Sequence, residues 1–189
     1  NDVITAICRK LISRHTHIFG NDTAENAGQV IQNWEEIKKK EKGIDTQAGV
    51  LKDIPSNLPA LMRSYKVQQK AANVGFDWDK PEDVFRKIDE EIAELKEAYK
   101  SNNVERMADE LGDVLFSVVN LSRFLNIQPE FALTGTVEKF IRRFQYIEAE
   151  SIRRGKKLKD MTLEEMDMLW DEAKAVLKKE GEEDKNENR

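Results

Sequence analysis

The sequence is poor in the residues that shape disulfide-rich, turn-rich or membrane-spanning proteins. Its single cysteine, Cys8, excludes an internal disulfide, and only 4 prolines and 9 glycines occur among 189 residues. No apolar run approaches the roughly 20 residues of a membrane span, and none resembles a signal peptide. These absences argue against a disulfide scaffold, a collagen-like chain and a turn-rich β-sandwich. We expect an all-α protein in a soluble, reducing, cytoplasmic setting that binds no membrane.

A surplus of positive charge is missing as well. Aspartate and glutamate number 36 against 31 lysines and arginines, which gives a net charge of −5. Nucleic-acid binding depends largely on basic side chains that neutralise phosphates, so nucleic acid is not expected as a partner. Apolar residues make up 39% of the chain, enough for the core of one domain, or of one domain and part of another.

Apolar residues at helical spacing predict a helix pair near the N-terminus and a longer helical region after residue 59. Between them, residues 43–58 lack periodicity and contain Gly43, Gly49 and Pro55, so we predict a linker there. Thr162 and Glu165 predict a capping box at the start of the last helix. The later helices are expected over about 59–74, 81–100, 104–128, 130–154 and 162–177, followed by a disordered charged tail, residues 180–189.

A weak internal repeat links the two ends of the sequence. Residues 10–14 (KLISR) resemble residues 139–143 (KFIRR), and residues 34–38 (WEEIK) resemble residues 170–174 (WDEAK), in the same order. We therefore expect residues 1–42 to be the trailing half of a domain whose full version occupies residues 59–179. The chain is accordingly expected to be a piece of a longer polypeptide.

Two pairs of acidic residues flank the predicted turn at residues 101–103. Residues three apart lie on one face of a helix, so Glu91 pairs with Glu94, and Glu110 pairs with Asp113. In an antiparallel hairpin centred on residue 102, Glu94 faces Glu110 and Glu91 faces Asp113, roughly 12 Å from the turn. The register therefore predicts that four carboxylates converge, whereas Glu90 points toward solvent.

Four inward carboxylates would repel one another and raise each other's pKa values unless a cation held them. A set of oxygen ligands selects a hard divalent ion, Mg²⁺ or Mn²⁺, before Zn²⁺ or Cu²⁺. A di-iron helical bundle is excluded because it requires Glu-x-x-His motifs, and His15 and His17 lie outside this domain. The alternative is that the acidic residues form an ordinary solvated face of charged helices.

A hard metal with basic side chains nearby indicates a phosphate-bearing substrate. The aromatic residues Trp170, Phe76 and Trp78 could either stack on a nucleobase or pack in a core. Each basic residue alone is typical of a solvated surface, but together they would neutralise a polyphosphate. They precede the acidic pairs and recur on a later helix: Lys87, Arg106, Lys139, Arg142 and Arg143.

In this order the residues resemble the MazG family of nucleoside triphosphate pyrophosphohydrolases. The hallmark of that family, Glu-Glu-x-x-Glu followed by Glu-x-x-Asp, matches residues 90–94 and 110–113. This motif alone leaves the related dimeric dUTPases open. The match is strengthened by Trp170, by the basic run 139–143, and by a lead-in that runs from LPALM at 58–62 to ANVGFDW at 72–78. The resemblance covers residues 55–179, and residues 1–42 match the end of the family's N-terminal domain.

The resemblance implies an all-α helical bundle with a catalytic hairpin, acting as a homodimer that converts a nucleoside triphosphate and water into the monophosphate and pyrophosphate. It implies Mg²⁺ ligation by Glu91, Glu94, Glu110 and Asp113, with Glu90 or a ligand such as Glu91 as the general base. A narrower dUTP or dCTP pyrophosphatase and a non-catalytic helical binding module are the alternatives, and no residue indicates a base-specific pocket. The implied nucleotide contacts are Lys87, Ile88, Asp89, Glu90, Glu91, Arg106, Met107, Ala108, Asp109, Asp113, Lys139, Phe140, Ile141, Arg142, Arg143 and Trp170.

Overall fold

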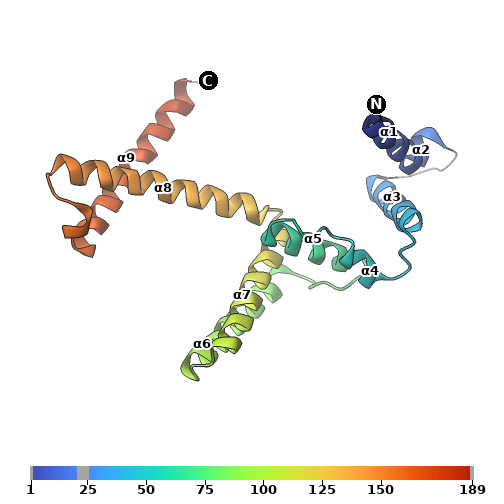
Figure 1. Cartoon of the computed structure of the whole chain (residues 1–189), viewed down its shortest axis with the longest axis horizontal. Coiled ribbons are helices and arrows are strands. Elements are labelled where there is room, and N and C mark those ends of the chain that lie inside the picture. Colours follow the sequence, from blue (N-terminus) through green and yellow to red (C-terminus); the bar gives the residue numbers. More distant parts are fainter. Residues whose placement is uncertain (1, 21–25, 188–189) are drawn as a thin grey trace. The chain divides into compact units, whose positions relative to one another are not determined.

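The computed structural model describes residues 2–20 and 26–187, with only the backbone for residues 27, 31, 32, 35 and 179–187. In this part of the chain all regular structure is helical, as predicted (Figure 1). None of its helices is both long enough and apolar enough to cross a bilayer. The α-helices, with one 3-10 helix η1, are α1 (Asp2–Arg14), α2 (Thr16–Phe19), α3 (Ala27–Lys42), α4 (Gln47–Lys52), α5 (Ala60–Ala72), α6 (Pro81–Lys100), α7 (Val104–Phe124), α8 (Pro129–Arg153), η1 (Leu158–Asp160) and α9 (Leu163–Glu187).

The chain divides into two compact units, residues 1–125 and residues 126–189. This division differs from the predicted one, which placed a linker at 43–58. That stretch instead contains α4, because the Thr46 hydroxyl caps its N-terminus by accepting a hydrogen bond from the Gly49 N–H at 3.0 Å. The Gln47 side chain also donates to the Lys70 carbonyl at 2.7 Å, which ties α4 to α5.

The predicted tail is helical over most of its length, because α9 continues to Glu187; residues 188–189 lie outside the described part. The predicted capping box begins this helix: the Thr162 hydroxyl accepts from the Glu165 N–H, and the Glu165 carboxylate accepts from the Thr162 N–H at 2.8 Å. Lysine and glutamate are good helix formers, so a helix nucleated by apolar packing can extend through them. The expectation of a disordered tail stays a prediction, and α9 has the bounds Leu163–Glu187.

Helices α6 and α7 form the hairpin that the acidic register requires (Figure 1). Pro81 occupies the first turn of α6, and the turn at residues 101–103 is closed by Asn102 in the left-handed region, at φ 53°. The Asn103 side chain accepts from the Arg106 N–H at 3.0 Å and caps α7. Val84 and Val119 are fully buried and supply the core of this unit.

Each end of the predicted repeat contains an arginine stacked on a tryptophan. In the first unit, the Arg14 guanidinium lies 5.2 Å from the Trp34 ring, between α1 and α3. In the second unit, the Arg143 guanidinium lies 5.2 Å from the Trp170 ring, between α8 and α9. The two segments that resemble each other in sequence therefore make the same contact.

Candidate active site

Three carboxylates meet within the α6–α7 hairpin. One oxygen from each of Glu91, Glu94 and Glu110 lies within 4.8 Å of the other two. Glu91 follows Ile88 by three positions and precedes Leu95 by four, so its side chain belongs to the core-facing side of α6 and is only 5% exposed. The sequence therefore predicted correctly that these three residues lie together.

Asp113 lies outside this cluster and is exposed. The mirrored register predicted a convergence of four carboxylates; three of them meet in the structure, and ligation by Asp113 stays a prediction. The register sets the height of a residue along the hairpin, but not its rotation about the helix axis. Asp113 lies about 60° around α7 from Glu110, and its side chain is one methylene shorter than that of a glutamate.

Two basic side chains neutralise part of the cluster. The Lys87 ammonium lies 2.7 Å from a Glu91 oxygen and 2.9 Å from a Glu90 oxygen. The Arg106 guanidinium lies 3.0 Å from a Glu110 oxygen. Lys87 and Arg106 each precede the acidic partner by four residues on the same helix, so the pairing follows directly from helical geometry. The carboxylates Glu91 and Glu90 raise the pKa of the Lys87 ammonium, chiefly through hydrogen bonds.

The repulsion among the carboxylates that Lys87 and Arg106 do not neutralise acts mainly on Glu94. The negative charge of Glu110 is the largest cause of its raised pKa, followed by burial and by the charge of Glu91. The donors are all carboxylate oxygens, which suits a hard divalent cation. Glu91, Glu94 and Glu110 could therefore hold such an ion after a small adjustment.

The other predicted residues of the hairpin surround the cluster at different depths. Glu90 is exposed, as predicted, and its contact is with Lys87. Ile88 and Met107 are half-buried. The remaining residues lie on the exposed faces of α6 and α7: Asp89, Ala108 and Asp109.

The second unit contains the other predicted nucleotide contacts. Phe140 lies 5.1 Å from Trp170, and Arg143 covers the same tryptophan ring. None of the ion pairs in the described part of the chain involves Arg143. The remaining members of this basic and aromatic cluster are exposed: Lys139, Ile141 and Arg142.

Comparison with known proteins decides the family. The MazG nucleotide pyrophosphohydrolase domain matches residues 79–147, which include the whole acidic hairpin. Over 176 residues the chain is 42% identical to the nucleoside triphosphate pyrophosphohydrolase of Escherichia coli (strain K12), covering 92% of this chain and 67% of that protein. The chain belongs to the MazG family of nucleoside triphosphate pyrophosphohydrolases.

Two further relatives extend this result. The nucleoside triphosphate pyrophosphohydrolase/pyrophosphatase MazG of Thermotoga maritima is 42% identical over 173 residues, which span 92% of this chain and 65% of that protein. The uncharacterized protein YabN of Bacillus subtilis is 44% identical over 178 residues, again 92% of this chain but 36% of the relative. The resemblance inferred from the motif is thus confirmed, and the chain spans about two thirds of the length of the two pyrophosphohydrolases.

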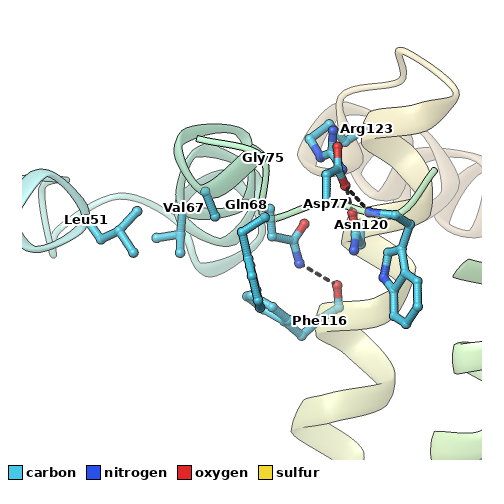
Figure 2. Close-up of a pocket in the computed structure, with 11 residues that line it drawn as sticks. Leu51, Val67, Gln68, Gly75, Asp77, Phe116, Asn120 and Arg123 are labelled. Carbon is cyan, nitrogen blue, oxygen red and sulfur yellow. Dashed lines mark hydrogen bonds and ion pairs between the residues drawn. The ribbon is translucent and has the colours of Figure 1, made fainter. Parts of the chain in front are cut away.

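One feature of this MazG-family chain was missed by sequence reasoning: a pocket of about 440 Å³ in the first unit (Figure 2). Gln68 on its wall follows Leu61 by seven positions on α5, where an apolar residue would continue the buried face. That polar residue at a core-facing position was the available signal. The lining residues are Leu51, Val67, Gln68, Ala71, Gly75, Phe76, Asp77, Trp78, Phe116, Asn120 and Arg123.

Proposed function

We propose that the chain catalyses the hydrolysis of a nucleoside triphosphate to the nucleoside monophosphate and pyrophosphate, with Mg²⁺ bound by the α6–α7 hairpin. The observation that carries this proposal is the cluster of Glu91, Glu94 and Glu110, in a chain that belongs to the MazG family. Asp113, one turn after Glu110, is the proposed fourth ligand. Mn²⁺ is compatible with the same oxygen donors.

The bound cation would polarise a phosphate oxygen and favour ionisation of the attacking water. Lys87 and Arg106 lie beside the carboxylates and would offset the charge that develops on the pyrophosphate leaving group. Glu90 is the proposed general base, because its carboxylate lies outside the cluster and is free of that role; Glu91 is the alternative. No covalent intermediate is required.

The resemblance also implies nucleotide contacts among the residues of the second unit. Arg142, Arg143 and Lys139 supply positive charge for phosphate groups, and Trp170 offers an aromatic face for the base. The other predicted nucleotide contacts on the two hairpin helices lie within one turn of the cluster or of its basic partners. They would position the substrate through backbone and side-chain contacts, without binding the metal or transferring a proton.

We further propose that the protein acts as a homodimer. Helix α8 has a stripe of apolar side chains at helical spacing that are 41–56% exposed: Leu133, Val137, Phe140 and Phe144. A soluble domain rarely exposes such a continuous apolar face, and a second copy of the chain would cover it. Sedimentation that shows only monomers at micromolar concentration would contradict this proposal. Nucleic acid and membranes remain unexpected as partners, and a cytoplasmic setting remains a prediction.

A panel of ribo- and deoxyribonucleoside triphosphates with Mg²⁺ tests the proposed activity. We expect release of monophosphate and pyrophosphate in a 1:1 ratio, and loss of activity in EDTA. One substrate that dominates the panel would favour the narrower dUTP or dCTP pyrophosphatase. Release of no pyrophosphate from any nucleotide would favour a non-catalytic binding module, and full activity in EDTA would contradict the metal site.

A further inference from the structure

We propose that the pocket of Figure 2 is a second ligand site, which binds a neutral aromatic lactam, a flat ring system with an N–H beside a carbonyl oxygen. The pocket is formed by α5, α7, the loop at residues 75–78 and Leu51 of α4, all within the first unit. None of its lining residues belongs to the carboxylate cluster or to the implied nucleotide contacts. The proposed site therefore does not depend on the proposed hydrolysis.

Unpaired polar atoms are concentrated at this pocket. Among the described residues, three buried side-chain polar atoms have no hydrogen-bond partner, and two of them belong to residues that line the pocket. These two are an oxygen of Gln68 and the Nε nitrogen of Arg123; the third is an oxygen of Glu130, in the second unit. Buried polar groups are normally paired, because burial removes the hydrogen bonds that they make to water. An acceptor and a donor left unpaired at one pocket indicate a ligand that satisfies both.

Gln68 provides the hydrogen-bond acceptor. Its side-chain nitrogen donates to the Phe116 carbonyl at 2.8 Å, between α5 and α7 (Figure 2). This bond sets the amide orientation, because the reverse orientation would place two carbonyl oxygens against each other. The side-chain oxygen is therefore left for a donor, and Gln68 is only 7% exposed. An N–H group of a ligand is the donor that this oxygen requires.

Arg123 provides the hydrogen-bond donor, and its surroundings favour a neutral ligand. Its Nη2 nitrogen pairs with the Asp77 carboxylate and also donates to the Asn120 side-chain oxygen at 2.9 Å (Figure 2). These contacts fix the guanidinium and balance its charge, while Nε remains without a partner. An anionic ligand would have to compete with Asp77, whereas a carbonyl oxygen can accept from Nε without breaking that ion pair.

The size and walls of the pocket suit one or two fused rings. Its volume is about 440 Å³, within the range of about 300–1,000 Å³ that is typical of small-molecule sites. Phe76, Trp78 and Phe116 supply aromatic surface, and Leu51 and Val67 add aliphatic surface. Aromatic rings pack favourably on one another in offset or edge-to-face arrangements. The walls therefore favour a flat aromatic ligand over an aliphatic amide.

A ligand can reach the two unpaired atoms only if part of the wall moves, because both atoms are buried. Phe76 is the most exposed of the three aromatic wall residues, at 83%, so its side chain has the fewest contacts to lose. It follows Gly75, which has a φ of 85° and lies in the loop between α5 and α6. We expect Phe76 to turn aside when the ligand enters and to pack on the bound ring.

The first test compares two probes that differ only in the N–H group. Isocarbostyril is a two-ring aromatic lactam, and N-methylisocarbostyril keeps the rings and the carbonyl oxygen but has no N–H. Calorimetric titration of the full chain in EDTA should show isocarbostyril binding about tenfold or more tightly than the methylated compound, because only isocarbostyril satisfies Gln68. Equal affinities, or no binding of isocarbostyril up to its solubility limit, would contradict the proposal.

The second test uses Gln68→Met with the matched control Gln69→Met. Methionine keeps the length of the side chain and removes the amide, and Gln69 is the exposed neighbour on α5. Gln68→Met should remove the preference for isocarbostyril over its methylated form, whereas Gln69→Met should keep it. Arg123→Lys, which keeps the charge and removes Nε, should weaken both probes by similar factors because both have the carbonyl oxygen. A wild-type preference in Gln68→Met would contradict the role of its oxygen, with circular dichroism checking that each variant is folded.

The third test asks whether this site is separate from the substrate site. A nucleoside triphosphate with Mg²⁺ should not displace isocarbostyril from the wild-type chain. Displacement would place the pocket within the substrate site and would contradict a second ligand site. A chain that binds isocarbostyril but releases no pyrophosphate from any nucleotide would contradict the proposed hydrolysis and leave the second site supported.

Discussion

The two arginine–tryptophan pairs of the chain have the same 5.2 Å separation between guanidinium and ring, but different electrostatic surroundings. Arg14, on Trp34, is 8% exposed and donates two hydrogen bonds to one oxygen of Glu41, at 2.5 and 2.8 Å. Ser13 donates to the other oxygen of that carboxylate at 2.9 Å. Arg143, on Trp170, is half-buried and has no such carboxylate among the described residues.

This difference shows how the same contact can serve structure or binding. A guanidinium already paired with a carboxylate gains little from an anionic ligand, since the pair must first be broken. A guanidinium that is held by an aromatic ring alone keeps its donors for phosphate. We therefore assign Arg14 to the stability of α1 and α3, and we propose that Arg143 contacts the nucleotide.

The largest loss of activity is expected from substitutions in the carboxylate hairpin. This hairpin and the Arg143–Trp170 pair both belong to the predicted catalytic domain. Glu91→Gln should reduce pyrophosphate release by at least about 100-fold, because it removes a buried ligand charge from the cluster. The helical circular dichroism should stay close to that of the wild type. Glu97→Gln, an exposed glutamate on the same helix, is the matched control and should retain activity. Equal activity of the two variants would contradict the metal assignment.

The direct test of this comparison replaces each of the two arginines by alanine, one at a time. Arg143→Ala should lower kcat/KM by about 10- to 100-fold, since a hydrogen bond to a charged group contributes about 1.5–3 kcal/mol. Arg14→Ala should leave kcat/KM nearly unchanged but lower the free energy of unfolding, because the buried Arg14 side chain and its contacts with Glu41 and Trp34 are lost. Steady-state kinetics and urea unfolding measure the two quantities. Loss of activity in Arg14→Ala at full stability would make the two pairs functionally equivalent.

A smaller effect is expected from Glu94, whose raised pKa reflects repulsion by Glu110. A carboxyl group with a raised pKa in the folded state opposes folding when it is ionised at neutral pH. Glu94→Gln should therefore raise the melting temperature of the metal-free protein at pH 7, by about 2 °C, and reduce the further increase caused by Mg²⁺. A thermal scan with and without Mg²⁺ measures both changes. A lower melting temperature in the metal-free variant would contradict the repulsion.

The smallest effect concerns the pH dependence of the α1–α3 contact. The Arg14 and Ser13 hydrogen bonds lower the pKa of Glu41 from its ordinary value of 4.5. The stabilisation is therefore present above pH 4.5 and lost as the pH falls through the lower pKa of the folded state. In Glu41→Gln the unfolding free energy should fall less steeply on acidification than in the wild type. Identical slopes for the two proteins would contradict this role of Glu41.

Much of the helical architecture could be predicted because its signals are local. Pro81, the polar turn around Asn102 and the Thr162 capping box mark helix boundaries within a few residues. The secondary structure of segments without apolar periodicity was harder to predict from the sequence. Residues 43–58 were predicted as a linker, but they contain α4, which depends on a single threonine cap and on contacts with α5. The end of α9 also lacks apolar periodicity, and only lysine and glutamate helix propensity favours a helix there.

By itself, the sequence determined the all-α class, the family and the three carboxylates of the cluster, since periodicity, motif spacing and hairpin register are properties of the chain alone. Only the tertiary structure decided which side-chain groups are paired with a neighbouring helix and which are left available to bind a ligand. It placed Asp113 outside the cluster and paired Arg14 with Glu41. It also left the Gln68 oxygen without a partner beside a pocket. The physical reason is that spacing sets the position of a side chain along a helix, whereas packing sets its burial, its rotation toward a neighbour and its hydrogen-bond partners.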